Sequence, residues 1–194
     1  MFIGYYNKSI ILTFVGLFFT VLGIKFSFDG SIGIACMMMI LSGICDCFDG
    51  YVASLVKRNE KEKLYGVELD SLVDTVCFGC FPVMLGIALG YTSYVNIIIY
   101  FIYLFCGITR LGYFNVDDDN KRCFKGVPIT TISFIFPVIV GITTNEVVMM
   151  LTYLIFSFLF LYKIEIKKVS LKGKKLILLL GFLLMLFLGW RFFF

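Results

Sequence analysis

Four aspartates, Asp46, Asp49, Asp70 and Asp74, stand in otherwise apolar stretches of the sequence. The first pair is three residues apart and the second pair is four apart, so each pair would share one face of a helix. Ionisable residues inside apolar helices are costly and usually functional. If the two helices form an antiparallel hairpin, the four carboxylates face one another near its connecting loop.

These carboxylates need a counter-charge, because four like charges at close range cannot all remain ionised. No Lys or Arg lies between Lys25 and Lys57 or between Lys63 and Arg110. We therefore expect a divalent cation, and an all-oxygen ligand set favours Mg²⁺, Mn²⁺ or Ca²⁺ over Zn²⁺. The simpler alternative is that the aspartates only hydrogen-bond between the two helices.

The composition indicates that lipid surrounds the elements that carry these residues. Of the 194 residues, 60% are hydrophobic and 15% are charged, against about 45–50% and about 25% in a soluble domain. The sequence has no His, so proton transfer near neutral pH would fall to a carboxylate, Lys, Tyr or Cys. We expect one membrane domain over residues 1–194 and no nucleic-acid partner.

The apolar runs predict an all-α fold, a polytopic bundle of six to seven transmembrane helices. A spanning helix needs about 20 residues, and no small-residue cleavage site follows the first run, which we therefore interpret as a span. The predicted spans are 9–27, 31–57, 66–90, 93–115, 127–143, 145–164 and 174–193. The fifth is short and contains Pro137, and the last is either a span or a surface helix.

The basic residues predict the orientation of this bundle. They gather between the second and third spans, between the fourth and fifth, and in the segment 163–175. Basic loops stay on the cytoplasmic side, so the N-terminus and the aspartates should face the cytoplasm, in a multi-pass protein of the cell membrane if the source is prokaryotic. We expect the 163–175 segment to set topology and touch anionic lipid heads, and the Asp117–Asp119 run to be a solvated loop.

The seven cysteines suggest a competing metal site, because Cys45, Cys47, Cys77 and Cys80 lie beside the aspartates. A thiolate zinc site would need their sulfur atoms to converge, but Cys45 and Cys47 are two residues apart and would point in different directions on a helix. Small reduced residues filling the core are the better interpretation.

The motif around the aspartates resembles the CDP-alcohol phosphatidyltransferase family. That family's signature is D-x-x-D-G-x-x-A-R, then eight residues, then G-x-x-x-D-x-x-x-D. Gly50, Ala53 and Gly66 occupy the signature's small-residue positions here, where a small side chain lets a ligand approach or lets helices pack closely. The sequence departs in two ways: Ser54 replaces the family Arg, and the intervening stretch has eleven residues. Arg58, about one turn later, is a candidate replacement for the missing guanidinium.

The phosphatidylserine synthase branch is the most similar part of the family. The segments that carry this resemblance are 68–72 with 78–82, 110–115 and 124–128. It implies a catalytic core over about 7–165, followed by an apolar C-terminal helix at 174–193. It also implies a homodimer that uses CDP-diacylglycerol and L-serine in the lipid bilayer and depends on Mg²⁺ or Mn²⁺, with Ca²⁺ as a further option.

The resemblance also implies roles for individual residues. Asp46, Asp49 and Asp70 would be metal ligands, and Asp74 would be the general base, with metal contact as well. The nucleotide would lie near Thr13, Gly50, Ala53, Ser54, Arg58 and Gly66. Arg110 and Lys125 are candidates for the lipid phosphate or the serine carboxylate; the alternative for Arg110 is snorkelling to the headgroups, and for Thr13 a hydrogen bond to its own helix.

Two other functions stay open from the sequence. Related enzymes with the same four aspartates use glycerol 3-phosphate or inositol as acceptor. Buried aspartates also serve cation transporters, although we find no inverted repeat of the kind common in transporters. Binding of CDP in the presence of metal would separate a transferase from a transporter.

Overall fold

The computed structural model describes residues 3–117, 123–167 and 171–193, and these are almost entirely helical. Its helices are α1 (Ile11–Phe28), α2 (Ile32–Leu55), α3 (Glu60–Asp74), α4 (Phe81–Ala88), α5 (Tyr94–Val116), α6 (Ile132–Ile142), α7 (Glu146–Leu161) and α8 (Leu171–Phe193). Short 3₁₀ turns, η1 (Lys8–Ile10) and η4 (Ile129–Thr131), precede α1 and α6, and a π-helical turn, η2 (Thr75–Cys80), joins α3 to α4.

The predicted all-α polytopic bundle is confirmed. Five helical segments of the described chain are long and apolar enough to cross a membrane: Lys8–Phe28, Ile32–Leu55, Glu60–Ala88, Tyr94–Val116 and Gly173–Phe192. The spans predicted at 127–143 and 145–164 form shorter apolar helices, Ile129–Ile142 and Glu146–Leu161. Pro128 and the 3₁₀ turn after it delay the start of α6, and Tyr162 in extended conformation ends α7.

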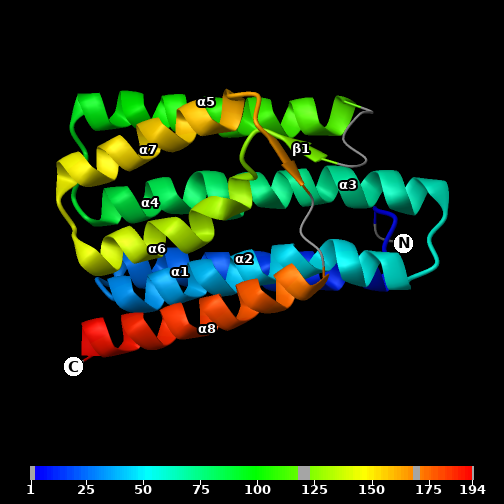
Figure 1. Ribbon diagram of the computed structural model, residues 1–194, viewed down its shortest axis with the longest axis horizontal. Helices are drawn as coiled ribbons and strands as arrows, with labels where there is room; N and C mark the ends of the chain where they lie inside the picture. The colour runs from blue at the N-terminus through cyan, green and yellow to red at the C-terminus, as the bar shows by residue number, and fades with distance from the viewer. Residues whose placement is uncertain (1–2, 118–122, 168–170, 194) are drawn as a thin grey trace.

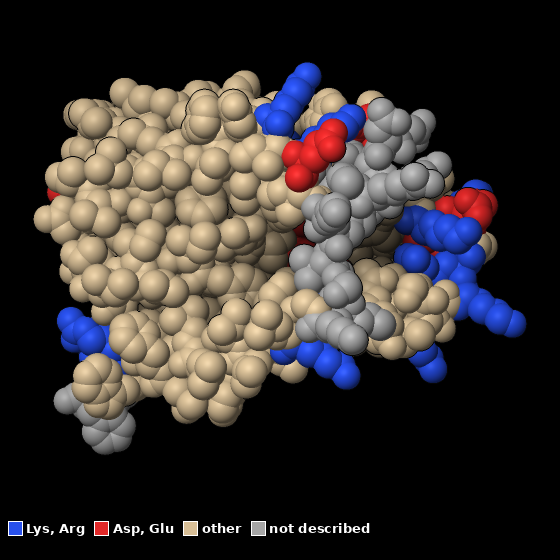
Figure 2. Space-filling view, viewed as in Figure 1, with Lys and Arg blue, Asp and Glu red and all other residues tan. Residues whose placement is uncertain are grey.

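Two of the helices, α6 and α7, end before the others at one end of the bundle. In Figure 1, α1, α2, α3 and α5 continue toward the end where the α2–α3 loop lies, whereas α6 and α7 stop before it. Charged side chains gather at this end in Figure 2 and are sparse over the rest of the face shown. At the opposite end, Lys25 forms an ion pair with Asp29. On the face shown, the charged side chains are therefore concentrated at the end that holds the α2–α3 loop.

Helix α3 begins earlier than the predicted start of the third span at residue 66. The Asn59 side chain accepts a hydrogen bond from the Glu62 backbone N–H at 2.9 Å, and the Glu62 carboxylate accepts one from the Asn59 N–H at 2.9 Å. This reciprocal capping box satisfies two backbone donors that would otherwise lack partners. It adds the segment 60–65, with its charged residues 60–63, to a helix that the hydropathy pattern alone starts later.

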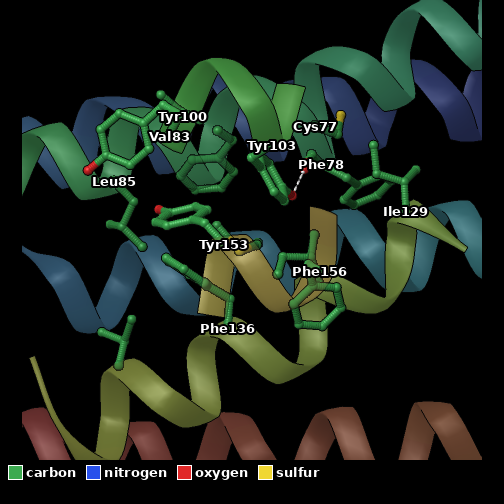
Figure 3. Close-up of a cluster of buried hydrophobic side chains, with 14 of the residues drawn as sticks. Cys77, Phe78, Val83, Leu85, Tyr100, Tyr103, Ile129, Phe136, Tyr153 and Phe156 are labelled. Atoms are coloured by element: carbon green, nitrogen blue, oxygen red, sulfur yellow. Dashed lines mark hydrogen bonds between the residues drawn. The ribbon is translucent and has the colours of Figure 1, made fainter. Parts of the chain in front are cut away.

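The third span is also not a uniform helix, because η2 follows directly on Asp74. Pro82 has no N–H to donate to the preceding turn, and the buried Tyr103 hydroxyl of α5 donates instead to the Phe78 carbonyl at 2.5 Å. Tyr153 of α7 similarly donates to the Pro82 carbonyl at 2.6 Å. Figure 3 shows these tyrosines inside the aromatic core. Two distant helices thus hold the irregular turn next to the aspartates.

Helix α8 is a packed member of the bundle. It contacts α2 and α6, and a Cβ at Gly181 would lie 3.0 Å from Cδ1 of Ile44 on α2. Leu188 is fully buried. For the C-terminal segment, these contacts favour a span over a surface helix.

A small antiparallel sheet connects two of the basic segments. Strand β1 (Cys123–Lys125) pairs with β2 (Glu165–Lys167), with Phe124 opposite Ile166. Lys125 forms an ion pair of 2.7 Å with Asp117, whose side chain is only 16% exposed. The expectation of a solvated Asp117 is therefore wrong, because Lys125 holds its carboxylate; Asp118 and Asp119 lie outside the described residues. The 163–175 segment, expected only to set topology, contains a strand that no apolar pattern predicts.

Candidate active site

Three of the four predicted aspartates converge closely enough to share one cation. One carboxylate oxygen each from Asp46, Asp49 and Asp70 lies within 4.8 Å of the others. Hard divalent cations bind oxygen ligands at about 2.0–2.6 Å, so a single ion fits such a set. Helix α2 supplies two of these carboxylates and α3 the third.

Asp74 is outside this group of three oxygens but adjoins it. Its side chain is 9% exposed and lies in hydrogen-bonding contact with the Asp46 carboxyl group, while Asp49 is in similar contact with Asp70. Asp74 is the last residue of α3, where η2 begins. The structure thus brings three carboxylates together and places the fourth, Asp74, beside them.

The donor set fits a hard cation in two respects. One Asp49 oxygen, Oδ2, is buried and has no hydrogen-bond partner among the described residues, and a cation would satisfy it. Thr130, in η4, donates a hydrogen bond of 2.7 Å to Oδ2 of Asp46. Contacts of this kind fix the orientation of a ligand carboxylate. No described cysteine joins the carboxylate cluster, so the structure gives the zinc-thiolate alternative no support.

The aspartates form the polar end of a cavity of about 940 Å³. Its polar lining includes all four aspartates, Arg110 and Lys174, whereas α6 and α8 contribute the apolar residues Phe134, Ile135, Val138, Ile139, Ile177, Leu180 and Leu184. Gly50 also lines it, and a Cβ there would meet no atom within 4 Å. The cavity therefore offers a charged end beside the cation site and an apolar continuation along two helices.

Arg110 is brought into this site by α5. Its side chain is 6% exposed, and its guanidinium lies 5.4 Å from the ring centroid of Phe114. It also interacts electrostatically with Asp74 and Asp46. The snorkelling alternative is wrong, because a headgroup-seeking side chain would be exposed at the membrane surface rather than buried beside the aspartates.

Thr13 lines a narrower cleft next to the same four aspartates. Among the described residues, its hydroxyl makes no hydrogen bond to a helix carbonyl, unlike Thr75 and Ser27, which bond to the carbonyls four residues before them. Nearby in sequence, Asn7 accepts a hydrogen bond from the Ser9 N–H at 2.8 Å, yet its Nδ2 is buried without a partner. The start of α1 thus carries polar groups that its own helix does not use.

Five predicted site residues line neither the large cavity nor the narrower cleft at Thr13: Ala53, Ser54, Arg58, Gly66 and Lys125. The Ser54 hydroxyl donates to the Tyr51 carbonyl of its own helix at 2.6 Å. The guanidinium of Arg58 lies beside Gly66, 3.6 Å from where a Cβ would be. Arg58 is therefore next to the motif's second glycine, although it belongs to the α2–α3 loop and not to α2.

Further polar residues, for which the sequence pattern predicts no role, also line the cavity. Thr130 bonds to Asp46, and Ser71 exchanges hydrogen bonds with Asn115, the Asn115 Nδ2 donating at 2.9 Å. Lys174, on α8, donates to the Cys47 carbonyl of α2. Ser71 and Asn115 stand in the segments that resemble phosphatidylserine synthases, whereas no local pattern distinguishes Thr130 or Lys174 from their neighbours.

Curated relatives share sequence with part of this chain. The archaetidylserine synthase of Methanothermobacter thermautotrophicus is 37% identical over 110 residues, which are 56% of this chain and 46% of the relative. CDP-diacylglycerol–serine O-phosphatidyltransferases of Saccharomyces cerevisiae and Bacillus subtilis are 36% and 33% identical, over 47% and 66% of this chain and 36% and 72% of their own lengths. The chain thus matches less than half of the first two relatives.

A family model for CDP-alcohol phosphatidyltransferases matches residues 7–161. The match includes the four aspartates, the cleft at Thr13 and the buried Arg110, and it ends before α8. Since it covers most of the sequence and the convergent carboxylates lie within it, the chain belongs to the CDP-alcohol phosphatidyltransferase family.

Proposed function

We propose that this protein transfers a phosphatidyl group from CDP-diacylglycerol to the hydroxyl of L-serine and releases CMP. The observation that carries the proposal is the convergence of Asp46, Asp49 and Asp70 at the charged end of a largely apolar cavity. Such a cavity suits a substrate with a pyrophosphate head and acyl tails. The names of the relatives, three of them serine-using transferases or synthases, favour serine as the acceptor.

The metal site in this proposal consists of Asp46, Asp49 and Asp70, with Thr130 holding Asp46 in place. A bound Mg²⁺, Mn²⁺ or Ca²⁺ would supply neutralisation of the pyrophosphate charge and of the charge that develops on departing CMP. The all-carboxylate donor set is the reason for preferring these hard ions. Asp74 remains a further contact for the same ion.

Asp74 is the proposed general base, which accepts the proton of the serine hydroxyl as the oxygen attacks phosphorus. It is buried, adjoins the metal ligands and lines the cavity. A positioned base contributes about 10²–10⁴-fold to the rate. The new bond joins the serine oxygen to phosphorus, and the bond that breaks joins that phosphorus to the bridging oxygen of CMP.

The remaining predicted residues would bind substrate. Arg110, beside Asp74, is placed for the lipid phosphate or the serine carboxylate, and Lys125, which pairs with Asp117, would need to exchange that partner for substrate. For the nucleotide we propose Thr13, Gly50, Ala53, Ser54, Arg58 and Gly66. Thr13 and Gly50 have the stronger support, because both line the space around the aspartates.

We further propose that the site faces the cytoplasm and that two copies form a homodimer. The orientation is supported by the basic loops at the end of the bundle near the aspartates. The dimer is supported only by family membership. The dimer is tested by measuring the mass of the purified protein in bilayer nanodiscs. A mass that corresponds to one copy would contradict the proposal.

The test is release of CMP from CDP-diacylglycerol by purified protein, with Mg²⁺ or Mn²⁺ and with or without L-serine. We expect release that requires both metal and serine and that falls by about 10²–10⁴-fold in Asp74→Asn. Release with glycerol 3-phosphate or inositol in place of serine would overturn the acceptor and leave the reaction class. A folded protein that binds no CDP in the presence of metal would support the transporter instead.

A further inference from the structure

Lys174 is a basic residue at the active-site cavity that lies outside the part of the chain matched by the family model. It belongs to the first turns of α8, whereas the match ends at residue 161. Its side chain is half-buried and lines the cavity together with Asp46 and Arg110. The next residue, Lys175, is exposed and does not line the cavity. Of two adjacent lysines, one is therefore directed to the site.

The Lys174 ammonium is held in place without being neutralised. It donates a hydrogen bond to the backbone carbonyl of Cys47, the residue after Asp46. An ammonium group has three N–H donors, so this contact leaves donors for another partner. Among the described residues it forms no direct ion pair with a carboxylate, although it interacts electrostatically with Asp46.

The charge balance of the cavity also calls for a cation at this place. Among the described residues, the lining contains four carboxylates and two basic side chains, Arg110 and Lys174. These two come from different helices: Arg110 on α5 lies near Phe114, and Lys174 on α8 bonds to the Cys47 carbonyl. A phosphate group that enters such an acidic site needs positive charge beyond that of the metal.

The face of α8 that carries Lys174 continues as an apolar wall of the cavity. Ile177, Leu180 and Leu184 follow at intervals of three, three and four residues, which keeps them on the same helix face. From Lys174 to Leu184 the helix rises about 15 Å, which is about half of a hydrocarbon core of about 30 Å. One helix face thus presents a cation and then an apolar surface as deep as one lipid leaflet.

We propose that Lys174 binds a phosphate oxygen of the CDP-lipid substrate, while the α8 face below it contacts an acyl chain. The proposal rests on the proposed function for the identity of the lipid. It makes α8 a part of the substrate site, in which the charge of Lys174 selects the anionic head at the depth of the metal ligands. The alternative is that Lys174 only stabilises the packing of α8 against α2, through its hydrogen bond to the Cys47 carbonyl.

The test compares Lys174→Gln, Lys174→Arg and the neighbouring control Lys175→Gln, each in nanodiscs with Mg²⁺. Equilibrium binding of CDP-diacylglycerol is measured, together with CMP release at varied lipid and varied serine. Because Lys174→Gln would lose a hydrogen bond between charged groups, we expect this variant to bind the lipid about 10- to 100-fold more weakly. The KM for serine should not change, Lys174→Arg should keep most of the affinity, and Lys175→Gln should match the wild type.

Equal lipid affinity in Lys174→Gln and Lys175→Gln would overturn the proposal. So would a Lys174→Gln protein with a lowered unfolding temperature and unchanged lipid affinity, because that result is expected if Lys174 only stabilises the packing of α8 against α2. Failure of the proposed function gives a different pattern: the wild type binds CDP-diacylglycerol but releases no CMP with serine. In that case the binding measurements on the Lys174 variants still decide the role of this residue.

Discussion

The aspartates of the proposed metal site differ in the groups that orient them. Asp46 has the best-defined support, because the Thr130 hydroxyl donates to its Oδ2 at 2.7 Å from another part of the chain. Asp49 instead has a buried oxygen without a hydrogen-bond partner among the described residues. The two aspartates of α2 are therefore held differently. Asp46 is tested through its partner Thr130, and Asp49 is tested by its own replacement.

Thr130→Val should weaken metal activation of CMP release by about 10- to 100-fold, the usual effect of losing a contact that orients a ligand. Its physical cause is the freed Asp46 carboxylate, so the metal concentration for half-maximal activity should rise. Thr130→Ser keeps the hydroxyl and should stay close to the wild type. If Val and Ser variants respond equally to metal, the hydrogen bond does not orient the ligand.

Asp49→Asn should remove metal-dependent activity while leaving the protein folded. The neutral amide is a poorer ligand for a hard cation, and the substitution relieves repulsion among the carboxylates. We therefore expect an unfolding temperature in metal-free buffer that is equal to or higher than that of the wild type. A marked loss of stability without metal would indicate instead that the aspartates serve as hydrogen bonds between helices.

Among the helices, the irregular turn η2 determines how the third span passes the site. Its six residues, Thr75–Cys80, come directly after Asp74, and π-helical turns are frequent at functional sites. The turn is stabilised from outside, because Tyr103 satisfies the Phe78 carbonyl. Figure 3 shows this contact within the aromatic cluster that joins α5, α7 and α4.

Tyr103→Phe should lower stability by about 1–3 kcal/mol, because the buried Phe78 carbonyl loses its donor. Thermal unfolding in a fixed detergent gives the measurement. Tyr113→Phe, at an exposed position of the same helix, is the control and should have little effect. Equal effects of the two substitutions would show that the Phe78 carbonyl does not need the Tyr103 hydroxyl.

The contact between α2 and α6 is similarly sensitive to a single methyl group. A Cβ at Gly43 would lie 2.8 Å from the Ser133 Cβ, whereas at Gly112 it would meet no atom within 4 Å. We expect Gly43→Ala to destabilise the protein by about 1–3 kcal/mol through overpacking, and Gly112→Ala to be neutral or stabilising by up to about 1 kcal/mol. Comparison of their unfolding temperatures tests the close approach; a neutral Gly43→Ala would contradict it.

In the molecule as a whole, charge and cavity lie at the same end. Figure 2 shows the charged side chains gathered there, and Figure 1 shows that α6 and α7 end short of it. Helix α8 packs against α2 and α6. We expect this arrangement to let the tails of the proposed lipid substrate stay in the bilayer while its phosphate meets the aspartates.

The orientation can be tested with single cysteines introduced at opposite ends. Lys61→Cys, at an exposed position near the charged start of α3, should react with a membrane-impermeant thiol reagent only from the cytoplasmic side. Thr92→Cys, in the exposed loop before α5, should react only from the other side. The unmodified protein is the control for its own thiols, and the opposite labelling pattern would reverse the proposed orientation.

The sequence by itself determined the helical class, the convergence of the aspartates and the family resemblance, because hydropathy and helical spacing are local properties. It could not determine that three aspartates converge while Asp74 adjoins them, since that depends on how α2 and α3 are rotated and on the π-helical turn after Asp74. Nor could it find Thr130 or Lys174, which lie 84 and 127 residues from their partners Asp46 and Cys47. Only the packing of α6 and α8 against α2 brings those groups together, and nothing in their neighbouring residues encodes that contact.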